Sequence, residues 1–242
     1  MSANLGSSVT AATLSKLPLF QGVPEDVLRR LAEGAATLRP ADGAQLFSQG
    51  DPPAAVFLII EGGGRVRVGA PDAADKRLMV EVFRAGDLLG EIGVLDGAPR
   101  SADATVLGEV RLLRIEGNAF RTAAQGCAPL ALNLARLLAA RLRRTFGLLQ
   151  DATFAPLEVR LARQVLYLAK TDGVKTAAGV RLGGRFRQPD LADLLGATTR
   201  SIITILNHWR AAEIVAYDTD KAFLTVRATE RLEAIAERMP DV

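Results

Sequence analysis

The period of the apolar residues changes along the chain, and these changes limit the folds that it can adopt. Between Ala44 and Ile115 the apolar residues come in short alternating or continuous runs, separated by glycine, proline and aspartate. This pattern is typical of an antiparallel sandwich or barrel of short strands. The strands that it predicts are Gln45–Ser48, Val56–Glu61, Arg65–Gly69, Leu78–Phe83, Ala104–Val106 and Val110–Ile115.

Helical periods precede and follow this region. A short helical lead-in is predicted over Leu14–Leu31, and a long helix over Pro129–Gln150. The long helix carries a narrow apolar seam that suits pairing with a second copy of the helix, although the seam would alternatively pack on the barrel of its own chain. The seam consists of Leu130, Leu134, Leu138, Leu142, Thr145 and Leu149. The pattern breaks around residues 151–156, where we place a hinge, and a new helix begins at Leu157.

Composition excludes several classes of protein. The chain has 242 residues, a formal charge of +3 and a single cysteine, Cys127. One cysteine permits neither an intrachain disulfide nor a thiolate-held metal cluster, and His208, the only histidine, cannot build a metal site alone. No apolar run is long enough to span a membrane and no export signal is present, so we expect a cytoplasmic protein without a metal.

The segment Phe83–Val106 carries the parts of an anion pocket. Gly90 allows the backbone to approach a ligand closely, and a short helix after it would direct its first amide groups at the site. Arg100 can make a two-pronged contact with phosphate oxygens, and Ser101 adds further donors. Glu91 cannot serve a phosphate, but its carboxylate can accept a hydrogen bond from a ribose hydroxyl.

This segment resembles the phosphate-binding cassette of cyclic-nucleotide-binding domains, and the chain from about Leu14 to Val226 resembles the cyclic-AMP receptor protein family of bacterial regulators. The resemblance implies that Gly90, Glu91, Arg100 and Ser101 hold the cyclic phosphate and the ribose. It also implies a base contact from Thr145 on the long helix. Phe146 stands where the family has a serine, so it would either stack on the base or fill the dimer seam. Cyclic AMP is the favoured effector; cyclic GMP or a ligand-independent regulator are the alternatives.

Residues 188–215 are predicted to form two helices joined by a tight turn. Pro189 suits a first helical turn, Gly196 suits the turn between the helices, and Thr198 suits an N-cap. The apolar residues Ile202, Ile205, Leu206 and Trp209 should be buried. The outward face can read bases in the major groove of DNA. The residues predicted to contact DNA are Gln188, Thr198, Thr199, Arg200, Ser201, Ile203, Thr204 and Asn207.

The order of these parts resembles that of the same family, with a winged helix-turn-helix whose wing strands are Val215–Tyr217 and Phe223–Val226. The resemblance implies an α+β fold: an antiparallel β-sandwich or roll over residues 1–126 with a disordered tail at 1–12, a dimerisation helix over 127–151, and a winged helix-turn-helix over 152–242.

We therefore expect a homodimeric transcriptional regulator that binds a near-palindromic operator in double-stranded DNA, with RNA polymerase as a further potential partner. Residues 152–242 contain no nucleophile with a base, no metal-ligand spacing and no glycine-rich phosphate loop, so we do not expect an enzyme. A regulatory or scaffold subunit that carries the same cassette is the less favoured alternative.

Overall fold

The computed structural model of the chain describes residues 10–62, 64–71 and 77–238. The fold is α+β and contains two compact units, which divide within the long helix α5 (Ala128–Phe154) after Arg143. The first unit comprises the residues up to 70 together with 81–143, and the second consists chiefly of the residues from 144 onwards. The domain limits at residues 126 and 151 stay a prediction.

The first unit is built on two antiparallel sheets, each with four strands. One has the order β1-β8-β3-β6 and the other the order β2-β7-β4-β5. The strands are β1 (Ala35–Leu38), β2 (Gln45–Phe47), β3 (Ala55–Glu61), β4 (Arg65–Pro71), β5 (Arg77–Phe83), β6 (Leu88–Leu89), β7 (Asp103–Leu107) and β8 (Arg111–Glu116). All six strands expected from the sequence are present, and the short strands β1 and β6 are additional.

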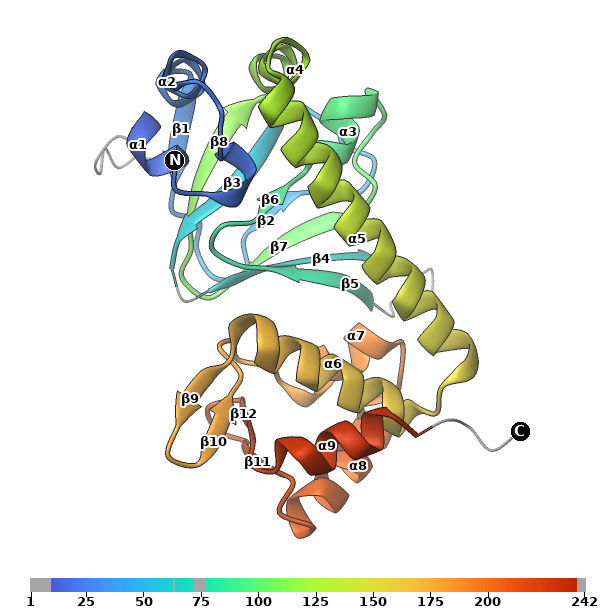
Figure 1. The fold of residues 1–242 in the computed structure, drawn as a ribbon. Coiled ribbons are helices and arrows are strands. Elements are labelled where there is room, and N and C mark those ends of the chain that lie inside the picture. The colour runs from blue at the N-terminus through green and yellow to red at the C-terminus, as the bar shows by residue number, and fades with distance from the viewer. Residues whose placement is uncertain (1–9, 63, 72–76, 239–242) are drawn as a thin grey trace. The chain divides into compact units, whose positions relative to one another are not determined.

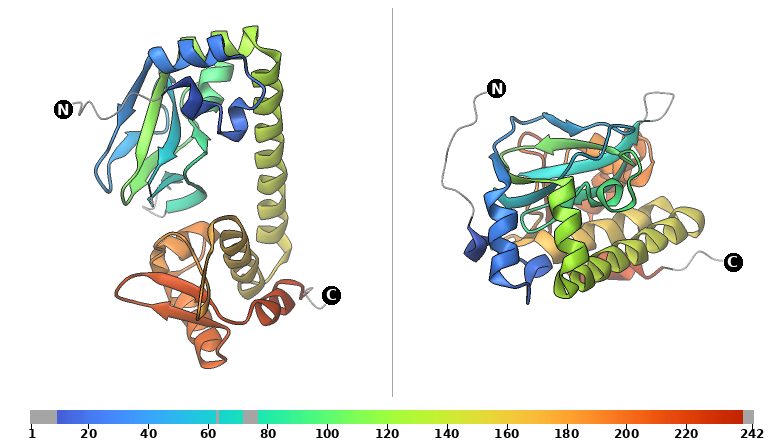
Figure 2. Two further views of the ribbon diagram at one scale, coloured as in Figure 1. Left: turned by 60° about the vertical axis from the view of Figure 1, so that its left-hand side comes forward. Right: turned by 90° about the horizontal axis from the view of Figure 1, so that it is seen from above.

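Strand β3 is buried on both of its faces, which explains its continuous apolar run. Phe57 and Ile59 point into the core between the sheets, whereas Val56 and Leu58 alternate with them and point into a second core beneath the helices. Helices α2 (Glu25–Glu33) and α4 (Gly117–Gly126) lie side by side over that second core (Figures 1 and 2).

The N-terminal lead-in is helical, as expected, and it is divided into three short segments. It consists of α1 (Ala11–Leu14), a 3-10 helix at Pro18–Phe20, and α2. Pro18 and Pro24 lack amide hydrogens and begin new segments, so one helix cannot continue through them. Helix α1 begins inside the tail predicted as disordered, and the rest of that tail, residues 1–9, lies outside the described residues.

The second unit combines four helices with a small sheet of order β11-β12-β10-β9. Helix α9 packs against α6 (Figure 1), and the Arg163 Nε donates to the Ala236 carbonyl over 2.8 Å. The helices are α6 (Leu157–Asp172), α7 (Gln188–Leu195), α8 (Thr199–Ala211) and α9 (Thr229–Ala236). The strands are β9 (Val174–Thr176), β10 (Gly179–Arg181), β11 (Val215–Asp218) and β12 (Phe223–Val226). The predicted wing strands correspond to β11 and β12.

Candidate functional site

The segment between β6 and β7 forms the predicted cassette and contains a short helix, α3 (Glu91–Asp96). Gly90 caps this helix with φ of +77°, a left-handed conformation that other residues adopt at a cost. A Cβ atom on Gly90 would also come within 2.5 Å of the Arg100 Nη1. Glycine is therefore needed at this position both for its backbone conformation and for the space that the arginine occupies.

Arg100 lies inside this cassette with 5% of its surface exposed. Its guanidinium stacks on the Phe47 ring at 4.3 Å and donates to two backbone carbonyls, Gly90 over 2.6 Å and Ala55. Burial lowers the pKa of Arg100, with nearby Asp51 and Glu91 acting in the opposite direction. The Nε atom is buried and has no hydrogen-bond partner. A buried cation that is held by neutral carbonyls and retains an unpaired donor fits an anionic ligand.

Glu91, the first residue of α3, is 2% exposed and forms an ion pair of 2.6 Å with Arg141 of α5. Arg141 also donates to the Leu88 carbonyl, and its guanidinium lies 4.6 Å from the centre of the Phe83 ring. Our sequence analysis missed Arg141. One sequence signal pointed to it: Arg141 lies one helical turn before Thr145, so the two residues share a face of α5.

The remaining predicted ligand residues lie at the surface. Ser101 directly follows Arg100 and is exposed. Thr145 and Phe146 are exposed on α5 beyond Arg143 and belong to the second compact unit. Their contact with a base therefore stays a prediction.

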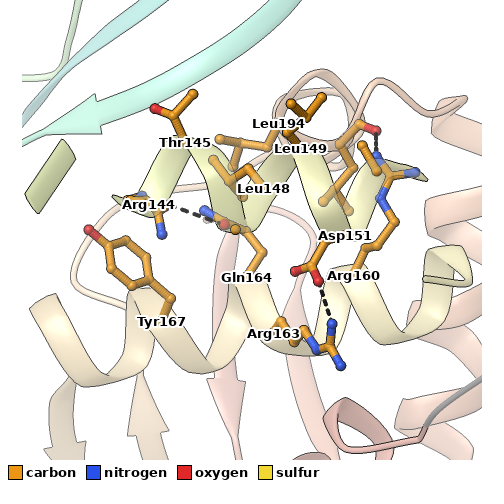
Figure 3. A pocket seen from close by; sticks show the side chains of 13 residues that line it. Arg144, Thr145, Leu148, Leu149, Asp151, Arg160, Arg163, Gln164, Tyr167 and Leu194 are labelled. Carbon is orange, nitrogen blue, oxygen red and sulfur yellow. Dashed lines mark hydrogen bonds and ion pairs between the residues drawn. The ribbon is translucent and has the colours of Figure 1, made fainter. Parts of the chain in front are cut away.

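A groove of about 570 Å³ runs between the last turns of α5, helix α6 and the end of α7 (Figure 3). Across it, Arg144 lies 3.4 Å above the Tyr167 ring and donates to Gln164 over 3.2 Å, while Arg163 pairs with Asp151. These contacts join the last turns of α5 to α6.

The predicted helix-turn-helix is present as α7 and α8. Gly196 ends α7 with φ of +58°, and the Thr198 hydroxyl accepts a hydrogen bond of 3.2 Å from the Ser201 amide. Gly196 and Thr198 thus act as the C-cap and N-cap that the sequence predicted.

Helix α8 separates a buried face from an exposed one. Ile202, Leu206 and Trp209 are buried, and the Trp209 indole donates to Glu158 over 2.8 Å. Ile205, also expected inside, is half-buried. Of the eight predicted DNA contacts, four are exposed and four are half-exposed. The exposed ones are Thr198, Arg200, Thr204 and Asn207, and the half-exposed ones are Gln188, Thr199, Ser201 and Ile203. The reading of bases by this surface stays a prediction.

Only part of the seam predicted on α5 is exposed to solvent. Leu130 and Leu134 are buried in the core of their own unit, and Leu138 packs against that core. A side chain that is already covered offers little area to a partner. These three residues therefore follow the alternative given above, in which the seam packs on its own chain. Leu142 and Leu149, by contrast, are 55% and 63% exposed.

The error has a physical reason, because α5 has two apolar stripes rather than one. The second stripe follows two interleaved seven-residue series: Leu132, Ala139, Phe146 and Thr153, and Ala135, Leu142 and Leu149. All of these residues are exposed except Ala139, which is half-buried. Such spacing is the a and d pattern of a two-stranded coiled coil. We call these residues the α5 stripe.

The described part of the chain offers neither a metal site nor a membrane span. No group of three or more His, Cys, Asp or Glu side chains there could hold a metal ion. Among the same residues, no helix combines the length and the apolar character that a membrane span needs.

Comparison with known proteins agrees with both parts of the site. Residues 39–126 match the cyclic nucleotide-binding domain, and residues 159–235 match the Crp-like helix-turn-helix domain. A CRP-like cAMP-activated global transcriptional regulator of Mycobacterium tuberculosis is 30% identical over 78% of this chain and 84% of that protein. The cyclic AMP receptor protein of Thermus thermophilus is 31% identical over 90% of this chain and 96% of that protein.

The fold matches solved structures as well. FixK2 from Bradyrhizobium japonicum superposes with a TM-score of 0.74 at 17% identity, covering 84% of this chain and 98% of that one. The cassette, the helix-turn-helix and these relatives lead to one conclusion: the chain belongs to the CRP family of transcriptional regulators.

Proposed function

We propose that this chain is a homodimeric regulator that binds a cyclic nucleotide, with cyclic AMP favoured, and then binds a near-palindromic operator in double-stranded DNA. The observation that carries the proposal is the buried Arg100 guanidinium with its unpaired Nε, beside Gly90 and Glu91. Because DNA is the proposed partner, we propose a cytoplasmic location for the regulator.

A cyclic nucleotide supplies a negatively charged phosphate, a ribose hydroxyl and a base. Arg100 would hold the phosphate, because its Nε still lacks an acceptor and its Nη atoms are engaged only by neutral carbonyls. A phosphate oxygen is a stronger acceptor for a guanidinium than a carbonyl is. The exposed Ser101 beside it adds a hydroxyl donor.

Glu91 would accept the ribose hydroxyl. Its Oε1 atom is engaged by Arg141, and the pair keeps the carboxylate at a fixed position in a buried site. Oε2 is the atom that we assign to the hydroxyl. Because Arg141 belongs to α5, this contact would connect the ribose to the long helix.

Two observations support adenine as the base of the nucleotide. Thr145 has a hydroxyl that can hydrogen-bond a purine edge, and the two curated relatives described above are cAMP-activated or named for cyclic AMP. Phe146 belongs to the exposed α5 stripe, which favours a role in the dimer over stacking on the base.

The α5 stripe would pair with the α5 stripe of a second copy. Its leucine and phenylalanine side chains are more than half exposed in the single chain, and pairing would cover them. A two-fold dimer presents two recognition helices, and these would enter successive major grooves about 34 Å apart. The Crp-like helix-turn-helix also favours DNA binding over a regulatory or scaffold role.

Calorimetric titration with cyclic AMP and cyclic GMP tests the proposal. Arg100→Gln should weaken binding about 100-fold, because a charged contact to phosphate is lost, while Arg39→Gln, a change at an exposed arginine outside the cassette, should have no effect. The 2′-deoxy nucleotide should bind more weakly than the ribonucleotide if Glu91 holds the hydroxyl. Absence of binding for both nucleotides by the unmutated protein would leave the ligand-independent alternative, and stronger binding of cyclic GMP would correct the base.

A further inference from the structure

We propose that Arg181, Arg185 and Phe223 form a second DNA-contacting site, which binds backbone phosphates outside the bases read by α8. We call these three residues the arginine shelf. The inference rests on the proposed DNA binding, but it concerns residues that neither the sequence pattern nor the family resemblance assigned to DNA.

The shelf is built on the outer face of the small sheet. Arg181 of β10 is paired with Thr225 of β12, and Phe223 lies two residues from Thr225 on the same face. The guanidinium carbon of Arg181 lies 4.7 Å from the centre of the Phe223 ring, and that of Arg185 lies 5.7 Å from it. One half-exposed aromatic ring therefore holds two cations.

The chain around Arg185 is fixed in place by its neighbour Phe186. Phe186 is buried, its amide donates to the Ala222 carbonyl over 2.8 Å, and its carbonyl accepts from the Tyr217 hydroxyl over 3.0 Å. Because successive residues of an extended segment point to opposite sides, Arg185 is directed outward, and it is exposed. The shelf is thus anchored to the turn between β11 and β12.

This location borders the elements that face DNA in proteins of this kind. Arg185 precedes the start of α7 at Gln188 by three residues. When a helix-turn-helix docks, its second helix enters the major groove and its first helix crosses the sugar-phosphate backbone. A cation just before the first helix and beside the wing turn therefore lies where flanking phosphates pass.

The charges of the shelf are not balanced within the described part of the chain. Neither Arg181 nor Arg185 forms an ion pair there, and the Nε of Arg181 is buried without a hydrogen-bond partner. Asp218 lies opposite Phe223 in the sheet, but its Oδ1 already accepts the amides of Asp220 and Lys221. Guanidinium groups whose faces rest on a ring keep their edges for phosphate oxygens.

The test measures DNA affinity over a range of salt concentrations, with an operator duplex and a random duplex of equal length. The variants are Arg185→Gln, Arg181→Gln and the double variant. Arg238→Gln, at an exposed arginine that follows α9, is the control for the loss of one charge. Each lost phosphate contact should reduce the slope of log affinity against log salt by about 0.9, and a dimer loses two contacts for each single substitution. Both duplexes should be weakened by the same factor.

Arg185→Lys should retain most of the slope, because it keeps the charge, whereas Phe223→Leu should reduce it by removing the ring. Thermal unfolding and nucleotide affinity of each variant show that the fold is intact. If the slopes equal that of the Arg238→Gln control, the arginine shelf does not bind phosphates and the proposal is wrong. Unchanged DNA binding with a loss of transcription activation would also contradict the proposal, since that result assigns the arginines to a protein partner. Failure of the unmutated protein to prefer the operator would instead overturn the proposed function itself.

Discussion

Arg141 of α5 forms an ion pair with Glu91 of α3 at 2.6 Å, and this contact ties the long helix to the cassette within the first unit. The last turns of the same helix are joined to α6 through Arg144 and Asp151. One continuous helix thus carries contacts to both the cassette and the DNA-binding unit. A ligand that changes the Glu91 contact would act on the element that reaches the helix-turn-helix, which is the coupling that allostery requires.

Removal of the Arg141 charge should destabilise the fold, because it leaves the buried Glu91 carboxylate without its ion-pair partner. Arg141→Gln is expected to lower the free energy of unfolding by about 2 to 3 kcal/mol, less than for a fully buried pair because Arg141 keeps some exposure. The same variant should weaken nucleotide binding. Urea unfolding and calorimetry measure both effects, and Arg143→Gln, at an exposed neighbour, is the control. Equal stability of the two variants would mean that the ion pair contributes nothing.

The α5 stripe should determine the oligomeric state. Leu142→Glu or Phe146→Glu places a charge on a surface that must be covered in the dimer, so each variant should sediment as a monomer at micromolar concentration. Ala140→Glu is the matched control, because Ala140 is exposed on the same helix but outside the stripe. Dimers that persist in both stripe variants would place the interface elsewhere.

Tyr217 should make the stability of the DNA-binding unit depend on pH in the alkaline range. Burial is the main cause that raises the pKa of Tyr217 above its ordinary value. As pH rises through about 10, the unfolded chain loses the proton while the folded chain retains it, so the free energy of unfolding falls.

Tyr217→Phe removes this dependence together with the hydrogen bond to Phe186. The variant should be about 1 kcal/mol less stable than the unmutated protein near neutral pH, and the difference should shrink above pH of about 10. Urea unfolding over this range is the measurement. A difference that stays constant with pH would show that Tyr217 titrates alike in the folded and unfolded chain.

Arg200 should read a base rather than a phosphate. It is exposed near the start of α8, where side chains of a recognition helix meet base edges. Arg200→Ala should cost about 1 to 3 kcal/mol of discrimination, and it should flatten the preference at one symmetric pair of operator positions. Selection from random DNA reports this, with Arg210→Ala as the control near the other end of α8. Uniform weakening over all sequences would instead indicate a phosphate contact.

Strands and caps were predictable because local chemistry determines them. The short apolar runs predicted β7 and β8, and the capping residues Gly196 and Thr198 predicted the turn between α7 and α8. The elements that were missed carry weak local signals. Strand β6 has only two residues, and α4 begins and ends with glycine, the residue with the lowest helix propensity after proline.

Contacts between distant segments were harder to predict. The period of α5 shows that apolar residues recur, but it does not reveal which stripe faces the core of its own unit, and Leu134 was therefore assigned to the partner. Arg141 and Glu91 are 50 residues apart in sequence, so only the fold brings their charges together. The cassette residues themselves were accessible, because Gly90, Glu91 and Arg100 lie within one short segment.

The central claim is that a nucleotide held by Arg100 controls DNA binding, and operator affinity with and without cyclic AMP tests it most directly. Fluorescence anisotropy of a labelled operator duplex gives both affinities for the unmutated dimer and for Arg100→Gln. We predict that saturating cyclic AMP increases the affinity of the unmutated protein by about tenfold or more and leaves that of Arg100→Gln unchanged. Equal operator affinity of the unmutated protein with and without the nucleotide would contradict the account.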